Sequence, residues 1–362
     1  MRKDTYLEVD LKKFENNIRN IMKHVVPKEV MPVIKADAYG MGVKNLIGVI
    51  NNIGIKTACV ALVVEGIELK EAGFNGDVLV INPCIIEEIE EAVKYDLILG
   101  ASIKEQIVEI DKQGKKYNKV MKIHLEIETG MNRTGIRLDD LGEYIDLCKS
   151  LENIEIQGIY THFATSDEKD SEYMYKQVDI FKKAVDMLHN NNIFPTYIHM
   201  QNSGGVFQLH NDNVTTAVRP GIIIYGHNIN EEFENIIDIK PISRLISKVA
   251  LIKEIEGNNN PYSIAGASKI ATIPIGYADG LPRSLSNKGS VVINGKICNI
   301  VGNVLMDNII VDVSNLEDVQ EGDVVYIWDN RKITVEDVAK LSNTINYEII
   351  SRISPRVERR YV

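Results

Sequence analysis

Eight short apolar runs between residues 30 and 225 constrain the fold more strongly than any other feature of this sequence. The runs are rich in Val and Ile, and their hydrophobicity is continuous rather than alternating. Continuous runs are typical of strands that are covered on both faces, as in a parallel sheet wrapped by helices. Because stretches with helical spacing and charged faces separate the runs, the sequence predicts a (β/α)8 TIM-type barrel. The runs are Val30–Ala36, Thr57–Leu62, Asp77–Asn82, Leu97–Ala101, Met121–Glu128, Ile156–His162, Tyr197–Met200 and Ala217–Tyr225.

A doubly wound open sheet is the alternative for a chain with this alternation of runs and helical stretches. Such a sheet usually carries a glycine-rich phosphate turn directly after its first strand. Here Ile34 is followed by KADAYGMG, which does not match the GxGxxG pattern. The first turn therefore favours the barrel.

The pattern changes beyond roughly residue 235, where short β-branched runs alternate with Gly, Asn, Asp or Pro turns. This pattern is typical of antiparallel strands. Only Thr334–Leu341 has helical character there, with Thr334 as an N-cap and acidic residues in the first turn. We therefore expect a barrel domain over residues 1–235 and a mainly antiparallel β domain over residues 236–362.

The net charge of the chain indicates which kinds of partner it can bind, and its cysteines indicate the cellular compartment. The 362 residues include 41 Lys and Arg against 51 Asp and Glu, a formal net charge of -10, which argues against a nucleic-acid surface and favours a small-molecule substrate. The four cysteines are scattered without a CxxC pair, as in a reducing compartment. The charged N-terminus does not resemble a signal peptide, and the longest apolar run, Ala58–Val64, is too short to cross a membrane. We expect a cytoplasmic protein without a membrane partner.

Polar residues collect where the predicted strands end, which is the side of a barrel that carries the active site. One of them, Lys35, ends the apolar run VMPVIK, and burial there would lower the pKa of its amine and make it a nucleophile suited to Schiff-base chemistry. The alternative is a lysine whose amine reaches solvent from the strand end. The others are Arg133 after the fifth strand, His162 at the end of the sixth, Asn202 and Ser203 after the seventh, and Arg219 with Gly221 at the eighth.

Glycines and hydroxyls beside these residues favour an anion site. Gly42 and the Ser203-Gly204-Gly205 sequence each precede or open a predicted helix, where backbone N–H groups can approach a phosphate, and the Tyr39 hydroxyl adds a donor. A barrel lysine together with a phosphate site suggests pyridoxal 5'-phosphate, which requires both.

These segments resemble the alanine racemases, the fold type III pyridoxal-phosphate enzymes. The motif VIKADAYGMG is similar to the cofactor-lysine motif of that family. It is followed in the family's order by ETGMNRTG, GIYTHFATSDE, IHMQNSGG, VRPGIIIYG, IPIGYADGLPR, GNVLMD and TINYEIISRIS, which together cover nearly the whole chain. Eight motifs in order imply a pyridoxal-phosphate-dependent amino-acid racemase.

The resemblance assigns a role to each site residue. Lys35 would hold the cofactor and act as the base on one face of the substrate, and Tyr262 of a second subunit would act on the other face. His162 would stand between Arg219 and Tyr262, and Arg219 would face the pyridine nitrogen. The remaining assignments are Tyr39, Ser203, Gly221 and Ile222 at the phosphate, Arg133 on the substrate side, and Met306 of the second subunit at the substrate carboxylate. The resemblance therefore implies a homodimer with two shared sites.

Three positions depart from the family pattern. Glu126 replaces a lysine that is carbamylated in many members, and its own negative charge could pair with Arg133. Asn303 replaces an arginine at the substrate entrance. Pro355 replaces a tyrosine that donates to the phosphate and narrows the pocket, which suggests that serine or a larger amino acid is accepted in addition to alanine or better than alanine.

Other functions remain open from the sequence alone. Basic amino-acid decarboxylases share the barrel and the cofactor, but they have a glycine triplet and a motif cysteine that Gly204-Gly205 and Cys298 do not reproduce. A single-domain pyridoxal-phosphate carrier would lack the residues beyond 235. His199 is interpreted as a satisfied core histidine, Tyr277 and Asp279 as turn residues, and Asn202 equally as an Asx-turn residue or a ligand.

Overall fold

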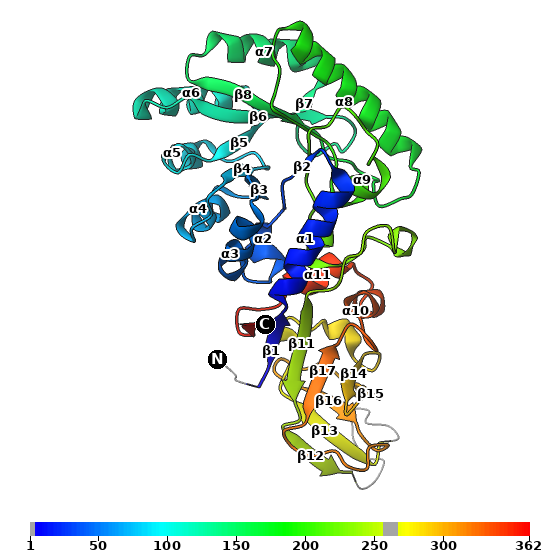
Figure 1. The fold of residues 1–362 in the computed structure, drawn as a ribbon. Coiled ribbons are helices and arrows are strands. Elements are labelled where there is room, and N and C mark those ends of the chain that lie inside the picture. Colours follow the sequence, from blue (N-terminus) through cyan, green and yellow to red (C-terminus); the bar gives the residue numbers. More distant parts are fainter. Residues whose placement is uncertain (1–3, 256–266) are drawn as a thin grey trace. The chain divides into compact units, whose positions relative to one another are not determined.

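The computed structural model describes residues 4–255 and 267–362 (Figure 1). The chain forms two compact units. The barrel unit comprises residues 13–38 and 43–240, and the β unit comprises residues 1–12, 39–42 and 241–362. The expected boundary near residue 235 stays a prediction.

The barrel unit contains parallel strands that follow one another in chain order. The sheet order is β3-β4-β5-β6-β8-β9, with β7 paired to β6, and β10 pairs with β2. All of these pairs are parallel. The strands are β2 (Glu29–Val30), β3 (Thr57–Val60), β4 (Asp77–Val80), β5 (Ile98–Ala101), β6 (Met121–Glu128), β7 (Ile136–Arg137), β8 (Ile154–Tyr160), β9 (Tyr197–His199) and β10 (Ala217–Val218).

Backbone hydrogen bonds close this sheet into a ring. Ile34 N donates to Cys59 O at 2.9 Å and joins the extension of β2 to β3. Thr216 N donates to Ile198 O at 2.8 Å and joins β10 to β9. Since β2 also pairs with β10, eight strands form a closed barrel, and each of the eight apolar runs overlaps one of them. The predicted (β/α)8 fold is confirmed.

Helices alternate with the barrel strands along the chain, because the apolar face of a helix is buried when it packs on the outside of the sheet. In α1 the buried residues Phe14, Ile18, Ile21 and Val25 repeat at helical spacing and form one apolar face. The helices are α1 (Leu11–Val25), α3 (Val43–Ile53), α4 (Val63–Glu71), α5 (Ile86–Lys94), α6 (Lys104–Tyr117), α7 (Leu141–Ser150), α8 (Glu172–Asn190) and α9 (Ser203–Gln208) (Figure 1). Among the described residues, no helix has both the length and the apolar character needed to cross a membrane.

The turn that follows the first barrel strand is left-handed. Helical turn α2 (Lys35–Tyr39) has φ between 52° and 54° at its four residues 36–39, none of which is glycine. Each L-residue in this conformation costs roughly 1–2 kcal/mol, so local preference opposes the turn. Gly40 continues it with φ 81°, where a Cβ would lie 2.6 Å from the carbonyl oxygen of Ile350. Contacts from outside the turn must therefore maintain it.

The β unit is mainly antiparallel, as predicted. Its larger sheet has the order β15-β14-β17-β11-β1-β18, in which only β1 and β18 pair in parallel, and β12-β13-β16 form a second sheet. The Thr334 hydroxyl accepts from Asp337 N at 3.1 Å and caps α10, as expected. The elements are β1 (Tyr6–Val9), β11 (Ser243–Lys248), β12 (Leu251–Glu254), β13 (Lys269–Ile273), β14 (Ser290–Ile293), β15 (Lys296–Asn299), β16 (Ile309–Asp312), β17 (Val324–Trp328), β18 (Glu358–Tyr361), α10 (Val335–Leu341) and α11 (Asn346–Ser351).

Candidate active site

Lys35 lies at the carboxyl end of the first barrel strand and begins the left-handed turn. Its side chain is half-buried. Burial lowers the pKa of the amine, the positive charge of Arg133 lowers it further, and the carboxylate of Glu65 opposes both effects. An amine with a lowered pKa is neutral in a larger share of molecules near neutral pH, which is the form that attacks an aldehyde.

Arg219, one residue beyond β10, is a buried cation at only 3% exposure. Its Nη1 donates to the carbonyl oxygen of His199 at 2.8 Å and lies 2.5 Å from the Nδ1 of the same residue. Its Nη2 donates to the carbonyl oxygen of Thr161 at 2.6 Å. Burial lowers the pKa of the guanidinium, but an arginine starts from so high a value that it stays protonated.

A line of neutral side chains extends from Arg219 through the barrel interior. His199 Nε2 lies 2.8 Å from His124 Nδ1, and His124 Nε2 lies 3.2 Å from Gln157 Oε1. Burial lowers the pKa of His124 to about 3 and that of His199 well below its usual value, so both rings are neutral. Because Arg219 can only donate, His199 Nδ1 accepts from Arg219, and His199 Nε2 donates to His124 Nδ1. His124 Nε2 in turn donates to Gln157 Oε1. His199 is a satisfied core histidine, as the sequence predicts. The sequence did not predict that Arg219 is its hydrogen-bond partner.

His162, just after the end of β8, has a neutral ring. Burial lowers the pKa of its half-buried ring to about 3, and the positive charges of Arg219, Arg133 and Lys35 add to this effect. The ring is therefore neutral and supplies no positive charge of its own. Among the described residues, Arg219 makes no hydrogen bond to His162. The other expected neighbour, Tyr262, lies outside the described residues.

The three phosphate-side residues of the barrel unit come together. Ser203 begins α9, and its hydroxyl accepts from Gly221 N at 2.9 Å. Ile222 follows Gly221 and is fully buried at the start of a 3-10 turn. Asn202 caps α9 by accepting from Gly205 N at 3.1 Å, which accounts for it as a turn residue. Hydroxyl and backbone N–H groups gathered in this way suit an anion.

The expected pair between Glu126 and Arg133 is not found among the described residues. Glu126 is 4% exposed, and its Oε1 accepts from the Thr134 hydroxyl at 2.8 Å. Its Oε2 is buried without a hydrogen-bond partner, whereas Arg133 is exposed. Burial raises the pKa of the carboxyl group. The loop directs Thr134 rather than Arg133 toward the carboxylate.

The candidate residues of the β unit lie mostly at its surface. Met306 is 53% exposed, and its carbonyl oxygen accepts from Ala278 N at 3.0 Å. Pro355 is exposed in the turn before β18. Tyr39, in contrast, is buried with its ring centroid 6.0 Å from that of Tyr347, and burial raises the pKa of its phenol. Asp279 Oδ2 accepts from the backbone N of residue 276 at 2.9 Å, as expected of a turn residue.

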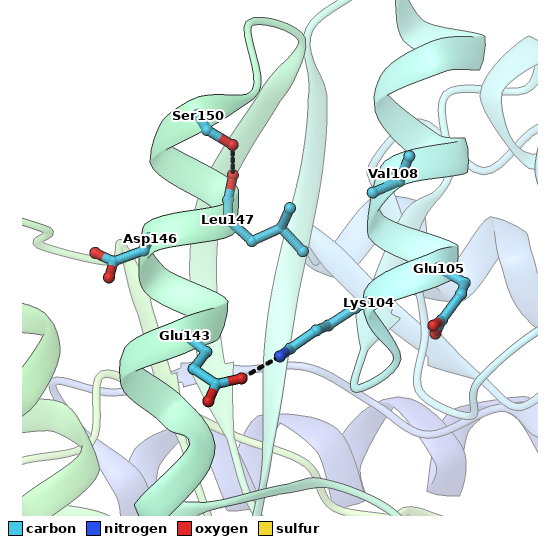
Figure 2. Close-up of a pocket in the computed structure, with 7 residues that line it drawn as sticks. All are labelled: Lys104, Glu105, Val108, Glu143, Asp146, Leu147 and Ser150. Carbon is cyan, nitrogen blue, oxygen red and sulfur yellow. Dashed lines mark hydrogen bonds and ion pairs between the residues drawn. The ribbon is translucent and has the colours of Figure 1, made fainter.

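A pocket of about 540 Å³ lies elsewhere, between α6 and α7 of the barrel unit (Figure 2). Figure 2 shows Lys104 paired with Glu143 across it, and Val108 and Leu147 in its apolar part. None of the residues that line it is a candidate site residue. The pocket therefore does not coincide with the strand-end site.

Comparison with known proteins identifies the family. Residues 9–229 match the alanine racemase N-terminal domain, and residues 242–361 match the alanine racemase C-terminal domain. The chain is 38% identical over 367 residues to an alanine racemase of Halothermothrix orenii, covering 99% of this chain and 96% of that protein. It is 36% identical over 368 residues to one of Methanococcus maripaludis, covering 99% and 98%.

Solved structures agree in fold over the whole chain. An alanine racemase of Clostridium difficile has a TM-score of 0.94 at 32% identity and covers 100% of this chain and 96% of its own. One of Bacillus anthracis with bound L-Ala-P has a TM-score of 0.91 at 32% identity, with the same coverage. The chain belongs to the alanine racemase family.

Proposed function

We propose that this protein interconverts L- and D-alanine with pyridoxal 5'-phosphate as its cofactor. The observation that carries the proposal is the half-buried Lys35 amine at the end of the first barrel strand, with a lowered pKa. Family membership supports the same activity.

The donor set of the barrel unit fits this cofactor. Lys35 supplies an amine for the aldehyde, and Ser203, Gly221 and Ile222 supply a hydroxyl and backbone N–H groups for the phosphate. Arg219 would face the pyridine nitrogen. Tyr39, which belongs to the β unit, would add a phenol donor at the phosphate. When bound, the cofactor spreads the negative charge that remains after a proton leaves the substrate Cα.

Two proton-transfer groups are needed because inversion removes a proton from one face and returns one to the other. Lys35 would hold and release the proton on one face. Tyr262 of the partner would do so on the other face, and Arg133 and Met306 would help to bind the substrate. Because the His162 ring is neutral, the positive charge that favours ionised tyrosine would come from Arg219 and Arg133.

Arg219 would limit how far the charge spreads. A guanidinium remains protonated and only donates, so it does not give a proton to the pyridine nitrogen. Its hydrogen bonds to His199 and Thr161 hold it in one orientation. Limited delocalisation would disfavour side reactions that begin with the same proton removal.

We further propose a homodimer with two shared sites. An apolar rim, defined as Leu62, Val64, Ile85, Ile86 and Ile103, is exposed on the loops and first helical turns that follow β3, β4 and β5. In the β unit, Tyr277, Leu305 and Met306 are also exposed. Monomeric proteins rarely leave such groups of large apolar residues uncovered.

We also propose that the protein is cytoplasmic. Its four buried free cysteines fit a reducing compartment.

We propose that the substrate range is wider than alanine. Pro355 offers no donor and a smaller side chain than tyrosine, so serine or a larger amino acid would be accepted besides alanine. Neither a decarboxylase nor a carrier protein is favoured by a specific observation.

The test is product analysis with wild-type protein and K35A. Wild-type protein incubated with L-alanine should lose optical rotation while the amount of carboxylate stays constant. K35A should show neither this change nor the visible absorbance of lysine-bound cofactor. Release of CO2, or turnover by K35A, would refute the proposal.

A further inference from the structure

The left-handed turn that carries Lys35 is held by a carboxylate outside the expected site. Glu65 Oε1 accepts from the backbone N of Ala36 at 2.7 Å. This is the peptide N–H directly after Lys35 and the first in the left-handed conformation. Glu65 is therefore bonded to the chain at the point where the unfavourable conformation begins.

The same carboxylate is fixed to a neighbouring barrel strand. Glu65 Oε2 accepts from Ala61 N at 2.8 Å and from Leu62 N at 3.1 Å, in the loop between β3 and α4. Both oxygens are thus occupied, one toward the lysine turn and one toward the next βα loop. The Glu65 side chain therefore joins, by hydrogen bonds, the turn after the first barrel strand to the loop after the second.

Other contacts hold the turn further along. Asp37 Oδ1 accepts from Val43 N at 2.7 Å, and Ala38 N donates to Ile34 O at 3.0 Å. Of the side chains that bond the turn, only Glu65 reaches the peptide that adjoins Lys35, among the described residues. The direction of the Cα–Cβ bond of Lys35 depends on the orientation of that peptide.

We infer that Glu65 is a positioning residue that fixes the backbone of Lys35 for attack on the cofactor aldehyde. The inference rests on the proposed function. In the attack, the neutral amine nitrogen would bond to the aldehyde carbon; as the C=N bond forms, the C–O bond breaks, and the aldehyde oxygen leaves as water with the two hydrogens of the amine. The rate depends on how often the amine is held within bonding distance and direction.

Replacing Glu65 would change the rate of attack in two opposite ways, one through the lost negative charge and one through the lost position of Lys35. The inference can therefore be tested. The carboxylate raises the pKa of Lys35, so loss of the charge alone leaves more neutral amine and speeds the attack. Loss of position slows it. In E65Q the amide has one acceptor oxygen instead of two, so one of the two sets of N–H groups loses its partner.

The experiment measures capture of pyridoxal 5'-phosphate by cofactor-free protein, trapped with borohydride and located on Lys35 by mass spectrometry. We expect E65Q to capture about 10-fold more slowly or worse than wild type, the scale of one hydrogen bond to a charged group. The deficit should persist at high pH, where the amine is neutral in both proteins. E65D, which keeps two acceptor oxygens on a shorter chain, should be intermediate.

The control is E68Q, one turn further along α4, where an exposed glutamate loses the same charge. It should capture as wild type does. Equal rates for E65Q and wild type at high pH, with only a displaced pH profile, would overturn the positioning role. If E65Q unfolds, an E65D rate equal to wild type would overturn it as well. Failure of wild-type protein to capture the cofactor would instead refute the proposed function.

Discussion

The candidate residues of the barrel unit and those of the β unit differ in how firmly their own unit holds them. Arg219 is buried and hydrogen-bonded to His199 and Thr161, and Ser203 is bonded to Gly221. Met306 and Pro355, in contrast, are exposed. The barrel unit thus positions Arg219 and Ser203 by its own contacts, whereas Met306 and Pro355 of the β unit are open to solvent. In the proposed homodimer, a second copy of the chain would cover them.

The largest effect should come from separating the two sides of the site on different chains. K35A and Y262F would each be inactive alone or nearly so. When they are mixed, denatured and refolded together, half of the dimers combine both chains, and each of these has one site with intact Lys35 and Tyr262. Activity should therefore return to about a quarter of the wild-type value, by the arithmetic of random pairing in a two-fold dimer.

The matched measurement is each variant refolded by itself. No recovery in the mixture, with dimers present by sedimentation, would mean that both groups come from one chain. The contrast between a self-sufficient barrel and an incomplete β unit would then be lost.

The hydrogen-bonded barrel interior should be costly to disrupt. H199A leaves a donor of Arg219 and a nitrogen of His124 without partners in a buried site, so the free energy of unfolding should fall by about 3 kcal/mol. Denaturant unfolding of the cofactor-free protein measures this loss. H210A, which removes an exposed histidine, is the control and should stay close to wild type. An H199A protein as stable as H210A would show that the line of side chains does not hold Arg219.

The fold was largely predictable because barrel strands leave a strong sequence pattern. Strands covered on both faces require continuous apolar runs, and all eight runs overlap a strand. Two strands of the β unit were missed for physical reasons. The edge strand β18 has the sequence ERRY, and β1 is only four residues long beside the polar start of α1. Because β18 is an edge strand, it tolerates charge, and its sequence does not show the pattern.

Less of the site could be predicted, because side-chain partners depend on directions across the barrel. The strand-end rule and the family resemblance gave Lys35, Arg219 and Ser203, whose roles stay predictions. Neither indicated that Arg219 contacts His199, or that Thr134 rather than Arg133 reaches Glu126. The left-handed turn was also missed, because ADAY contains no glycine to signal a positive φ.

Acid should weaken the barrel interior. The pKa of buried His124 is about 3 instead of 6.5, so the unfolded chain takes up a proton at a higher pH than the folded chain does. The free energy of unfolding should therefore fall as the pH decreases from about 6.5 toward about 3. Thermal melts of the cofactor-free protein across this range measure the loss. H124Q, which cannot gain the charge, should lose less stability, while H210Q should follow wild type. Parallel curves for H124Q and wild type would contradict a neutral buried His124.

The smallest effect on activity is expected from variants of Pro355, an exposed residue of the β unit. They test whether this unit, and not only the barrel unit, limits which substrate is accepted. P355Y restores the phenol that the family pattern has at this position, which would narrow the pocket and add a phosphate donor worth about 0.5–1.5 kcal/mol. The ratio of kcat/KM for serine to that for alanine should fall several-fold, and the cofactor should bind more tightly. P355F adds the ring without the hydroxyl, so it should lower the ratio and leave cofactor affinity unchanged. If both variants keep the wild-type ratio, residue 355 does not limit the substrate, and the breadth of the pocket must be set by the barrel.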